Sequence, residues 1–340
     1  MNTTELEATV RAMTACGKGL LAADESGGTI KKRFDSIGLE STEVSRRDYR
    51  QMLFTTDGLE QAVSGVILYD ETLRQGTDDG RSLASILQGK GIVPGIKVDK
   101  GTIGMAPGSA EKLTEGFDGL AKRYDEYYAL GARFAKWRAV YSITDHLPSA
   151  RNVLLNAQGL ARYAAITQQS GLVPIVEPEV LMDGAHTLER CEEVTTGVLQ
   201  AVFAALVAEG VALELMVLKP NMVISGKDCA VQASARQVAE ATVRSFRRTV
   251  PAAVPGIMFL SGGQGDLQAT ENLNAINALS AHHPWVFSFS YGRALQAPSL
   301  KAWGGQKANI AAGQRALHKR ALLNGAACRG EYTSQMEQAG

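Results

Sequence analysis

The chain has 340 residues, and 45% of them are hydrophobic, which is enough for a large buried core in one α/β barrel or in two ordinary domains. Thirty-five basic residues balance 35 acidic ones. A neutral chain lacks the overall positive field that attracts nucleic acid or an anionic membrane surface, so any anionic ligand must be held by a local cluster of charges.

The cysteines and the N-terminal segment indicate a reduced, cytoplasmic protein. The four cysteines show no CxxC or Cys/His spacing, so we expect buried thiols rather than disulfides or structural zinc; they are Cys16, Cys191, Cys229 and Cys328. The first 19 residues contain neither an apolar signal core nor the acid-poor composition of a transit peptide. Nowhere do about 18 apolar residues follow one another without a break, so we expect no membrane association.

Short apolar runs, each ending abruptly in charged or polar residues, recur along the chain. Near-continuous apolar character with little alternation is typical of strands that are buried on both faces. Eight such runs occur, at residues 19–26, 65–72, 91–100, 132–141, 172–179, 213–221, 256–263 and 285–293.

Segments with helical periodicity separate these runs. Residues 120–128 place leucine and tyrosine on one helical face, and residues 188–205 place apolar side chains on another. The segment from Ser149 to Gly171 has an N-cap serine and a C′ glycine, so it also predicts one helix. Strands and helices therefore alternate, and no Gly/Ser-rich or Pro-rich linker interrupts them.

The spacing of these elements favours one repeated βα unit. The polar residue that ends each middle run recurs every 41 or 42 residues, at Lys136, Glu177, Lys219 and Ser261. Eight parallel strands with helical crossovers close into a (β/α)8 barrel, so we predict a single α/β TIM-barrel domain over residues 1–340. A short, polar, flexible tail is expected from about residue 333. In this fold the active site lies at the C-terminal ends of the strands.

In a barrel the polar residues at the strand ends converge on one cleft. Taken alone, each is more often a solvated or ion-paired residue. As a set they bring several cations and carboxylates together in a neutral protein, at an electrostatic cost that burial alone does not explain. We interpret the following as a functional set: Asp24, Asp70, Lys97, Asp99, Lys136, Arg138, Glu177, Glu179, Lys219, Ser261 and Arg293.

Lys219 ends an apolar run and would stand at the mouth of a dry barrel. Burial and neighbouring cations both disfavour a charged ammonium, so the neutral amine is expected to be available to attack a ketone, as Schiff-base chemistry requires. The alternative is an ion pair with a carboxylate such as Glu177, which would keep the lysine charged and unreactive.

Glu177 and Glu179 flank Pro178 on one predicted strand. They are expected to point to opposite sides, or to bracket a turn, so that one faces the amine and the other orients nearby lysines. Two carboxylates in different surroundings can supply both an acid and a base. Ordinary ion pairing is the alternative.

Two glycine-containing turns have the features of a phosphate site. Ser261-Gly262-Gly263 follows the seventh run, and Gly292-Arg293 follows the eighth. This is the position at which barrels commonly hold a phosphate with backbone N–H groups and an arginine.

A second candidate anion site lies after the first run, where Ser26 and Thr29 flank two glycines and precede Arg33, with Lys97 nearby. The same residues also suit a plain helix N-cap. Two phosphate sites would imply a bisphosphate ligand.

Seven motifs resemble those of one known family, the class I fructose-1,6-bisphosphate aldolases. They are LAADES, GIKVDKG, AKWRAV, PIVEPE, LKPNMV, FLSGGQ and SYGRALQ, and they stand in the family's order. The resemblance covers the chain from about Gly17 to Tyr332. It implies a barrel enzyme that cleaves fructose 1,6-bisphosphate to triose phosphates without a metal or other cofactor, and it suggests a homotetramer.

The resemblance also implies roles for single residues. Lys219 would form the Schiff base, Glu177 would act as general acid and base, and Asp24 and Lys136 would assist at the reacting carbon. The remaining matches would hold the C1 phosphate (Ser261, Gly262, Gly263, Gly292 and Arg293, with Arg33 nearby), hold the C6 phosphate (Ser26, Thr29 and Lys97), or shape the electrostatics of the pocket (Arg138 and Glu179).

Two departures from the family pattern stand out. Thr29 replaces a common serine and keeps the hydroxyl, so little effect is expected. The chain ends in EYTSQMEQAG, without the terminal tyrosine that the animal enzymes use for proton exchange, so that role is either absent or taken by another group.

Other functions stay open at this point. An aldolase preferring sedoheptulose 1,7-bisphosphate or fructose 1-phosphate would share these motifs, whereas a transaldolase-like enzyme would not. A catalytically silent scaffold barrel would have lost Lys219 or Glu177, and both are present. A metal-dependent class II aldolase is disfavoured because the histidines show no ligand spacing; they are His146, His186, His282, His283 and His318.

Overall fold

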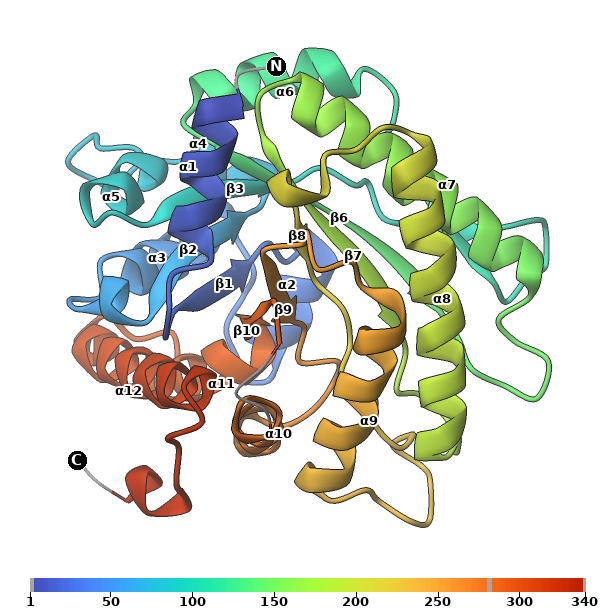
Figure 1. The fold of residues 1–340 in the computed structure, drawn as a ribbon. Coiled ribbons are helices and arrows are strands. Elements are labelled where there is room, and N and C mark those ends of the chain that lie inside the picture. Colours follow the sequence, from blue (N-terminus) through green and yellow to red (C-terminus); the bar gives the residue numbers. More distant parts are fainter. Residues whose placement is uncertain (1–2, 280–282, 339–340) are drawn as a thin grey trace.

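A computed structural model describes residues 3–279 and 283–338. Within these residues, eight parallel strands close into a barrel in the order β1-β10-β9-β8-β7-β6-β3-β2 (Figure 1). The strands are β1 (Gly19–Ala23), β2 (Val63–Leu68), β3 (Val93–Lys97), β6 (Phe134–Tyr141), β7 (Val173–Val180), β8 (Val217–Leu218), β9 (Gly256–Phe259) and β10 (Val286–Tyr291). The predicted fold class is confirmed.

Helices cover the barrel, most of them as an outer layer around the strands (Figure 1). They are α1 (Thr3–Met13), α2 (Gly27–Asp35), α3 (Glu43–Phe54), α4 (Asp70–Arg74), α5 (Leu83–Gly89), α6 (Leu120–Ala129), α7 (Ala150–Gln169), α8 (Leu188–Ala208), α9 (Ala235–Thr249), α10 (Asp266–Ala278), α11 (Arg293–Trp303) and α12 (Ile310–Cys328). Short 3-10 helices complete them: η1 (Leu59–Gln61), η2 (Leu213–Leu215), η3 (Lys307–Asn309) and η4 (Ser334–Glu337).

Each predicted apolar run contains a barrel strand, but the sixth is shorter than expected. Its first residues form η2, and only Val217–Leu218 pair as β8. The predicted helix from Ser149 to Gly171 is α7, and the Ser149 side chain caps it by accepting a hydrogen bond from the Asn152 N–H. The sequence did not predict the antiparallel hairpin of β4 (Thr102–Gly104) and β5 (Lys112–Thr114), which is short and consists of exposed and half-buried residues.

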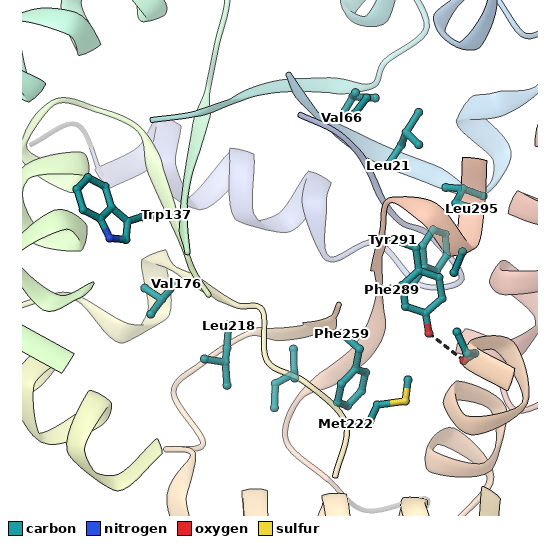
Figure 2. Close-up of a cluster of buried hydrophobic side chains, with 14 of the residues drawn as sticks. Leu21, Val66, Trp137, Val176, Leu218, Met222, Phe259, Phe289, Tyr291 and Leu295 are labelled. Atoms are coloured by element: carbon teal, nitrogen blue, oxygen red, sulfur yellow. Dashed lines mark hydrogen bonds between the residues drawn. The ribbon is translucent and has the colours of Figure 1, made fainter. Parts of the chain in front are cut away.

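Two apolar cores lie on opposite sides of the barrel wall. The outer core fills the space between strands and helices, and Figure 2 shows part of it; Leu21, Val66, Trp137, Val176 and Leu218 point outward there from five strands. Alternate residues of the same strands point inward, because successive side chains on a strand face opposite sides. They form the inner core, which includes Leu20, Phe134, Val173, Ile175 and Val217.

The inner core fills the N-terminal end of the barrel. Leu6, Val10 and Met13 of α1 pack against it and close that end. Gly95 on β3 makes room for Phe134, since a Cβ at Gly95 would lie 2.1 Å from that ring. The interior is therefore packed at one end, and space for a ligand remains at the other.

The helix α8 is long and apolar enough, by length and composition, to cross a membrane. In this fold it lies between α7 and α9 and packs against β7. Val198, Val202 and Leu206 are buried in the outer core. Its apolar composition therefore suits its place as a barrel helix.

The expectation of four buried thiols is wrong. Cys191 is buried, Cys229 and Cys328 are half-buried, and Cys16 is exposed. The spacing of cysteines in a sequence does not predict their burial, because burial depends on which face of the helix or loop the rest of the fold covers.

The end of the chain differs from the predicted flexible tail. Residues 334–337 form η4, and the Glu337 carboxylate pairs with Arg320 of α12 and accepts a hydrogen bond from the Tyr332 hydroxyl at 2.8 Å. The Tyr332 N–H also donates to the Asn274 side chain at 2.9 Å. This part of the tail therefore docks on α10 and α12.

Candidate active site

A cavity of about 1260 Å³ opens at the C-terminal ends of the strands. Every residue that the sequence singled out as a site residue lines it, and so do Asp70 and Asp99 from the strand-end set. These residues are Asp24, Ser26, Thr29, Arg33, Lys97, Lys136, Arg138, Glu177, Glu179, Lys219, Ser261, Gly262, Gly263, Gly292 and Arg293. The structure thus brings together groups that are up to about 270 positions apart in the chain.

Strand alternation explains this convergence. On β7, Val173 and Ile175 belong to the inner core, so Glu177 and Glu179, two and four residues further on, face the same interior. The prediction that the two glutamates point to opposite sides or bracket a turn is therefore wrong. Pro178 lies inside the strand, between two side chains on one face.

Lys219 directly follows β8, and its side chain is 5% exposed. Its Nζ lies 3.2 Å from Oε1 of Glu177. The backbone N–H of Lys219 donates to the Val176 carbonyl at 2.8 Å and so extends the pairing of the two strands. The amine and a carboxylate are therefore in contact inside a buried site, which is the geometry needed to move a proton between them.

The carboxylate of Glu177 lies between two amines. Its Oε2 is 3.4 Å from Nζ of Lys136 and makes no hydrogen bond within residues 3–279 and 283–338. A buried carboxylate oxygen that makes no hydrogen bond is costly unless a ligand uses it. This oxygen is suited to a hydroxyl group of a bound substrate or to a water molecule.

Lys136 is surrounded by carboxylates. Its Nζ lies 2.7 Å from Asp24 and 3.8 Å from Asp99. Burial alone would lower the pKa of Lys136, but the charges of Asp24, Glu177 and Asp99 outweigh it and raise the pKa above its usual value. Burial likewise would raise the pKa of Asp24, and the positive charges of Lys136 and Lys219 lower it instead. Lys136 and Asp24 are thus held as a charged pair.

Arg138 and Glu179 form a second ion pair on the neighbouring strands β6 and β7. Burial opposes the charge of Arg138, but Glu179 outweighs it and raises the pKa of the guanidinium. The side chain of Arg138 is 40% exposed, whereas that of Lys136 is 4% exposed. This pair therefore lies nearer the opening of the cavity.

The first candidate phosphate site is built by the turns after β9 and β10. Gly262 and Gly263 have φ values of +55° and +86°, which L side chains rarely adopt, and a Cβ at Gly263 would lie 2.3 Å from the Met182 sulfur. Arg293, the first residue of α11, is exposed and donates to the Gly263 carbonyl. The guanidinium and the glycine turn are therefore adjacent.

The second candidate site lies at the start of α2. The hydroxyl oxygens of Ser26 and Thr29 are 3.2 Å apart, and Ser26 is the N-cap of the helix but makes no side-chain cap hydrogen bond. Lys97 lines the same cavity from β3, and its Nζ lies 2.6 Å from Asp99. The hydroxyls are thus free of the N-cap role that the sequence offered as the alternative.

Several residues of the cavity were not predicted as site residues. Glu25 follows Asp24 directly and pairs with Arg33 and Arg50, and the α4 and α6 side chains Arg74 and Tyr127 also line the cavity. Asp99 was in the strand-end set but received no role. Arg50 and Tyr127 lie on helices, where the sequence carries no strand-end signal.

In the part of the chain that the structure describes, no group of three or more His, Cys, Asp or Glu side chains could hold a metal ion. His282, one of the five histidines considered as ligands, lies outside the described residues. The cavity instead combines lysines, carboxylates and two candidate anion sites.

Comparison with known proteins decides the family. The family model described as "Fructose-bisphosphate aldolase class-I" matches residues 5–340. The chain belongs to the class I fructose-bisphosphate aldolase family. The resemblance inferred from the seven motifs is confirmed, and so is the prediction that the chain is a lyase.

Curated relatives of this family match nearly the whole chain. A "Probable fructose-bisphosphate aldolase class 1" from Xanthomonas campestris pv. campestris is 51% identical over 333 residues, covering 98% of this chain and 99% of that protein. The "Fructose-bisphosphate aldolase, non-muscle type" of Lethenteron camtschaticum is 52% identical, covering 96% and 90%. "Fructose-bisphosphate aldolase 4, cytosolic" from Arabidopsis thaliana is 51% identical, covering 98% and 84%.

A solved structure of this family has the same fold. The fructose-bisphosphate aldolase from Plasmodium falciparum, in a complex with TRAP and a small molecule inhibitor, aligns with a TM-score of 0.96. It is 50% identical in sequence, and the alignment covers 97% of this chain and 96% of that one.

Proposed function

We propose that this aldolase reversibly cleaves fructose 1,6-bisphosphate to dihydroxyacetone phosphate and glyceraldehyde 3-phosphate through a Schiff base on Lys219. The observation that carries the proposal is the contact between Nζ of Lys219 and Glu177 at 3.2 Å, in a buried cavity that also holds two candidate phosphate sites. A scaffold barrel would have no need to bury these charged groups together.

Schiff-base formation uses Lys219 and Glu177. Glu177 takes a proton from the ammonium, and the neutral amine attacks the C2 ketone. The C–N bond forms as the π bond of the carbonyl breaks, and a proton moves from the nitrogen to the oxygen, which gives the carbinolamine. The carboxyl group of Glu177 returns the proton to the departing hydroxyl, which leaves as water, and an iminium remains. The contact of Oε1 with Lys219 and the absence of a hydrogen bond to Oε2 within the described residues support the assignment of both proton transfers to Glu177.

Bond cleavage follows at C3–C4. Asp24, held ionised by Lys136, accepts the proton of the C4 hydroxyl, while the electron pair of the C3–C4 bond moves to the iminium and forms an enamine. The aldehyde product is glyceraldehyde 3-phosphate. The positive charge of Lys136 stabilises negative charge that develops on the C4 oxygen. Protonation of the enamine at C3 and hydrolysis of the imine release the ketone product and the free amine.

The two anion sites suit the two ends of the substrate. Arg293 and the Ser261–Gly263 turn, with Gly292 and Arg33 beside them, would hold the C1 phosphate. Ser26, Thr29 and Lys97 would hold the C6 phosphate. These sites also suit sedoheptulose 1,7-bisphosphate, whose extra carbon fits a cavity of about 1260 Å³, and fructose 1-phosphate, which leaves the second site empty.

Trapping tests the Schiff base. Sodium borohydride added together with dihydroxyacetone phosphate should inactivate the enzyme and leave a reduced adduct on Lys219, located by peptide mass spectrometry, because borohydride reduces an imine to a stable amine. Borohydride without the ketone is the control and should leave activity intact. An adduct on another lysine, or no adduct, would contradict the proposed mechanism.

Assays with the three sugar phosphates test the substrate. The highest kcat/KM is expected for fructose 1,6-bisphosphate, because it fills both anion sites. The Arabidopsis relative is named cytosolic, and we propose a cytoplasmic location for this aldolase as well. A homotetramer remains a prediction from the family resemblance, and light scattering of the purified protein measures the assembly directly.

A further inference from the structure

The carboxylate of Glu25 is shared by two arginines. Its Oε1 accepts hydrogen bonds from Nη1 of Arg33 and from the Gln296 amide, the latter at 2.8 Å. Its Oε2 accepts a hydrogen bond from Nη2 of Arg50. The Glu25 side chain is only 4% exposed, so these partners, rather than water, balance its charge.

The two arginines differ in what they can reach. The Arg33 side chain is 20% exposed and lines the cavity, and its Nη2 would lie 3.4 Å from a Cβ added to Gly292. The Arg50 side chain comes from α3, is 3% exposed and is not part of the cavity wall. Nη1 of Arg50 has no hydrogen-bond partner within the described residues.

Gln296 fixes the orientation of the shared carboxylate. Its amide nitrogen also donates to the Ala22 carbonyl at 2.6 Å, and its amide oxygen accepts a hydrogen bond from the Tyr49 hydroxyl at 3.0 Å. Tyr49 precedes Arg50 on α3, whereas Gln296 lies on α11. The network therefore joins α2, α3 and α11 behind the wall of the cavity.

Charge counting assigns different roles to the two cations. One carboxylate and two guanidinium groups leave a net charge of one positive unit. Arg50 is enclosed, so the surplus charge is presented to the cavity at Arg33. Without Arg50, Glu25 and Arg33 would form a neutral pair, and a phosphate would have to compete with Glu25 for the Arg33 guanidinium.

We propose that Arg50 is a positioning residue for phosphate binding, which holds Glu25 and so keeps the charge of Arg33 available to a substrate phosphate. The proposal rests on the proposed function, because it requires a phosphorylated substrate in this cavity. Arg50 does not touch the substrate. It acts through Glu25 and Arg33.

Substitution of Arg50→Met tests the proposal, since it removes the charge and keeps an apolar side chain. We expect KM for fructose 1,6-bisphosphate and the inhibition constant of inorganic phosphate each to rise about tenfold, with kcat within about twofold of the wild type. Arg50→Lys keeps a cation and should recover most of the affinity. Unchanged constants in a folded Arg50→Met protein would overturn the proposal.

A double substitution separates the charge effect from loss of packing. In Glu25→Gln/Arg50→Met both buried charges are gone and Arg33 has no carboxylate to neutralise it, so phosphate affinity should return to within about threefold of the wild type. A purely structural role of Arg50 predicts no recovery, and that result would overturn the proposal. If Arg50→Met does not fold, Glu25→Gln alone decides: phosphate should bind more tightly, and equal or weaker binding contradicts the proposal.

Arg320→Met is the matched control, because Arg320 is also a buried, carboxylate-paired arginine but does not line the cavity. It should leave KM and the phosphate inhibition constant unchanged. Borohydride trapping on Lys219 in the wild type distinguishes failure of the proposed Schiff-base function from failure of the proposed role of Arg50. Absence of the adduct refutes the Schiff-base function, whereas trapping with unchanged constants in Arg50→Met refutes only the role of Arg50.

Discussion

The carboxylate of Glu177 contacts the amines of both Lys136 and Lys219. Its replacement therefore tests whether this carboxylate transfers protons in the proposed reaction. Glu177→Gln keeps the shape of the side chain but removes the acid and base, and kcat should fall by about 10²–10⁴ with the fold intact. Steady-state kinetics together with circular dichroism measure this. The matched control is Glu179→Gln, on the same face of β7 but paired with Arg138. A near-normal kcat in Glu177→Gln would transfer the role to Glu179 or Asp24.

Arg293 is exposed and stands beside the Ser261–Gly263 turn, where it would bind a phosphate in ground and transition states alike. Arg293→Ala should therefore raise KM strongly and lower kcat less, with a loss of about 2–4 kcal/mol in kcat/KM. Initial rates over a range of fructose 1,6-bisphosphate concentrations give both constants. Arg236→Ala, a change at an arginine 82% exposed on α9, is the control. If KM stays the same in Arg293→Ala, the phosphate binds elsewhere.

For several single residues, the sequence was sufficient to predict their place in the cavity. Lys219, Glu177, Asp24 and Lys136 could be expected in one cavity, because each is a charged residue within or directly after an apolar run and closure of the barrel brings these runs together. Arg50 and Glu25 received no role. Arg50 lies on a helix, and its contact with a carboxylate 25 positions earlier depends on how α3 packs against the loop after β1.

Among the elements, the C-terminal 3-10 helix η4 is expected to stabilise the folded protein. Deleting residues 334–340 removes Glu337 and leaves Arg320 with Asp266 as its nearest carboxylate, at 3.8 Å. We expect the free energy of unfolding to fall by about 1–3 kcal/mol, measured by urea denaturation. Glu337→Gln keeps the segment but removes its charge, and should account for much of that loss.

The same deletion tests whether the tail takes part in catalysis. Tyr332 and Glu337 are bound to each other and to α10 and α12, and neither lines the cavity in the described structure. Cleavage of fructose 1,6-bisphosphate and release of tritium from labelled dihydroxyacetone phosphate should therefore stay almost unchanged. Slower tritium release by tenfold or more, about 1.4 kcal/mol in barrier height, with cleavage preserved would show that the tail reaches the active site.

The sequence predicted the boundary of an element where the capping residue and the apolar spacing indicate the same position. α7 begins after Ser149 as predicted, because that side chain caps the helix and apolar residues follow at helical spacing. The run 213–221 was predicted as one strand and instead contains η2. Continuous apolar character identifies burial but does not distinguish a strand from a buried helical turn. The docking of η4 was missed for another reason, since it depends on partners on α10 and α12.

For the whole molecule, the proposed Schiff-base mechanism requires no metal ion. Activity should survive prolonged dialysis against EDTA, because lysine and carboxylate side chains supply the Schiff base and the proton transfers. The measurement is the rate of fructose 1,6-bisphosphate cleavage before and after chelation, with a zinc-dependent hydrolase treated in parallel to confirm removal of metal. Complete loss of activity with recovery on added zinc would favour the class II chemistry instead.

The pairing of β1 on both sides has a consequence for synthesis of the chain. β1 bonds to β2, which follows it closely, and to β10, where Leu20 is in register with Ser290. While the ribosome is still translating the middle of the chain, one edge of β1 has no partner, and unpaired strand edges favour association between chains. The barrel cannot close until β10 has emerged, so this edge of β1 stays open to association with other chains during most of translation.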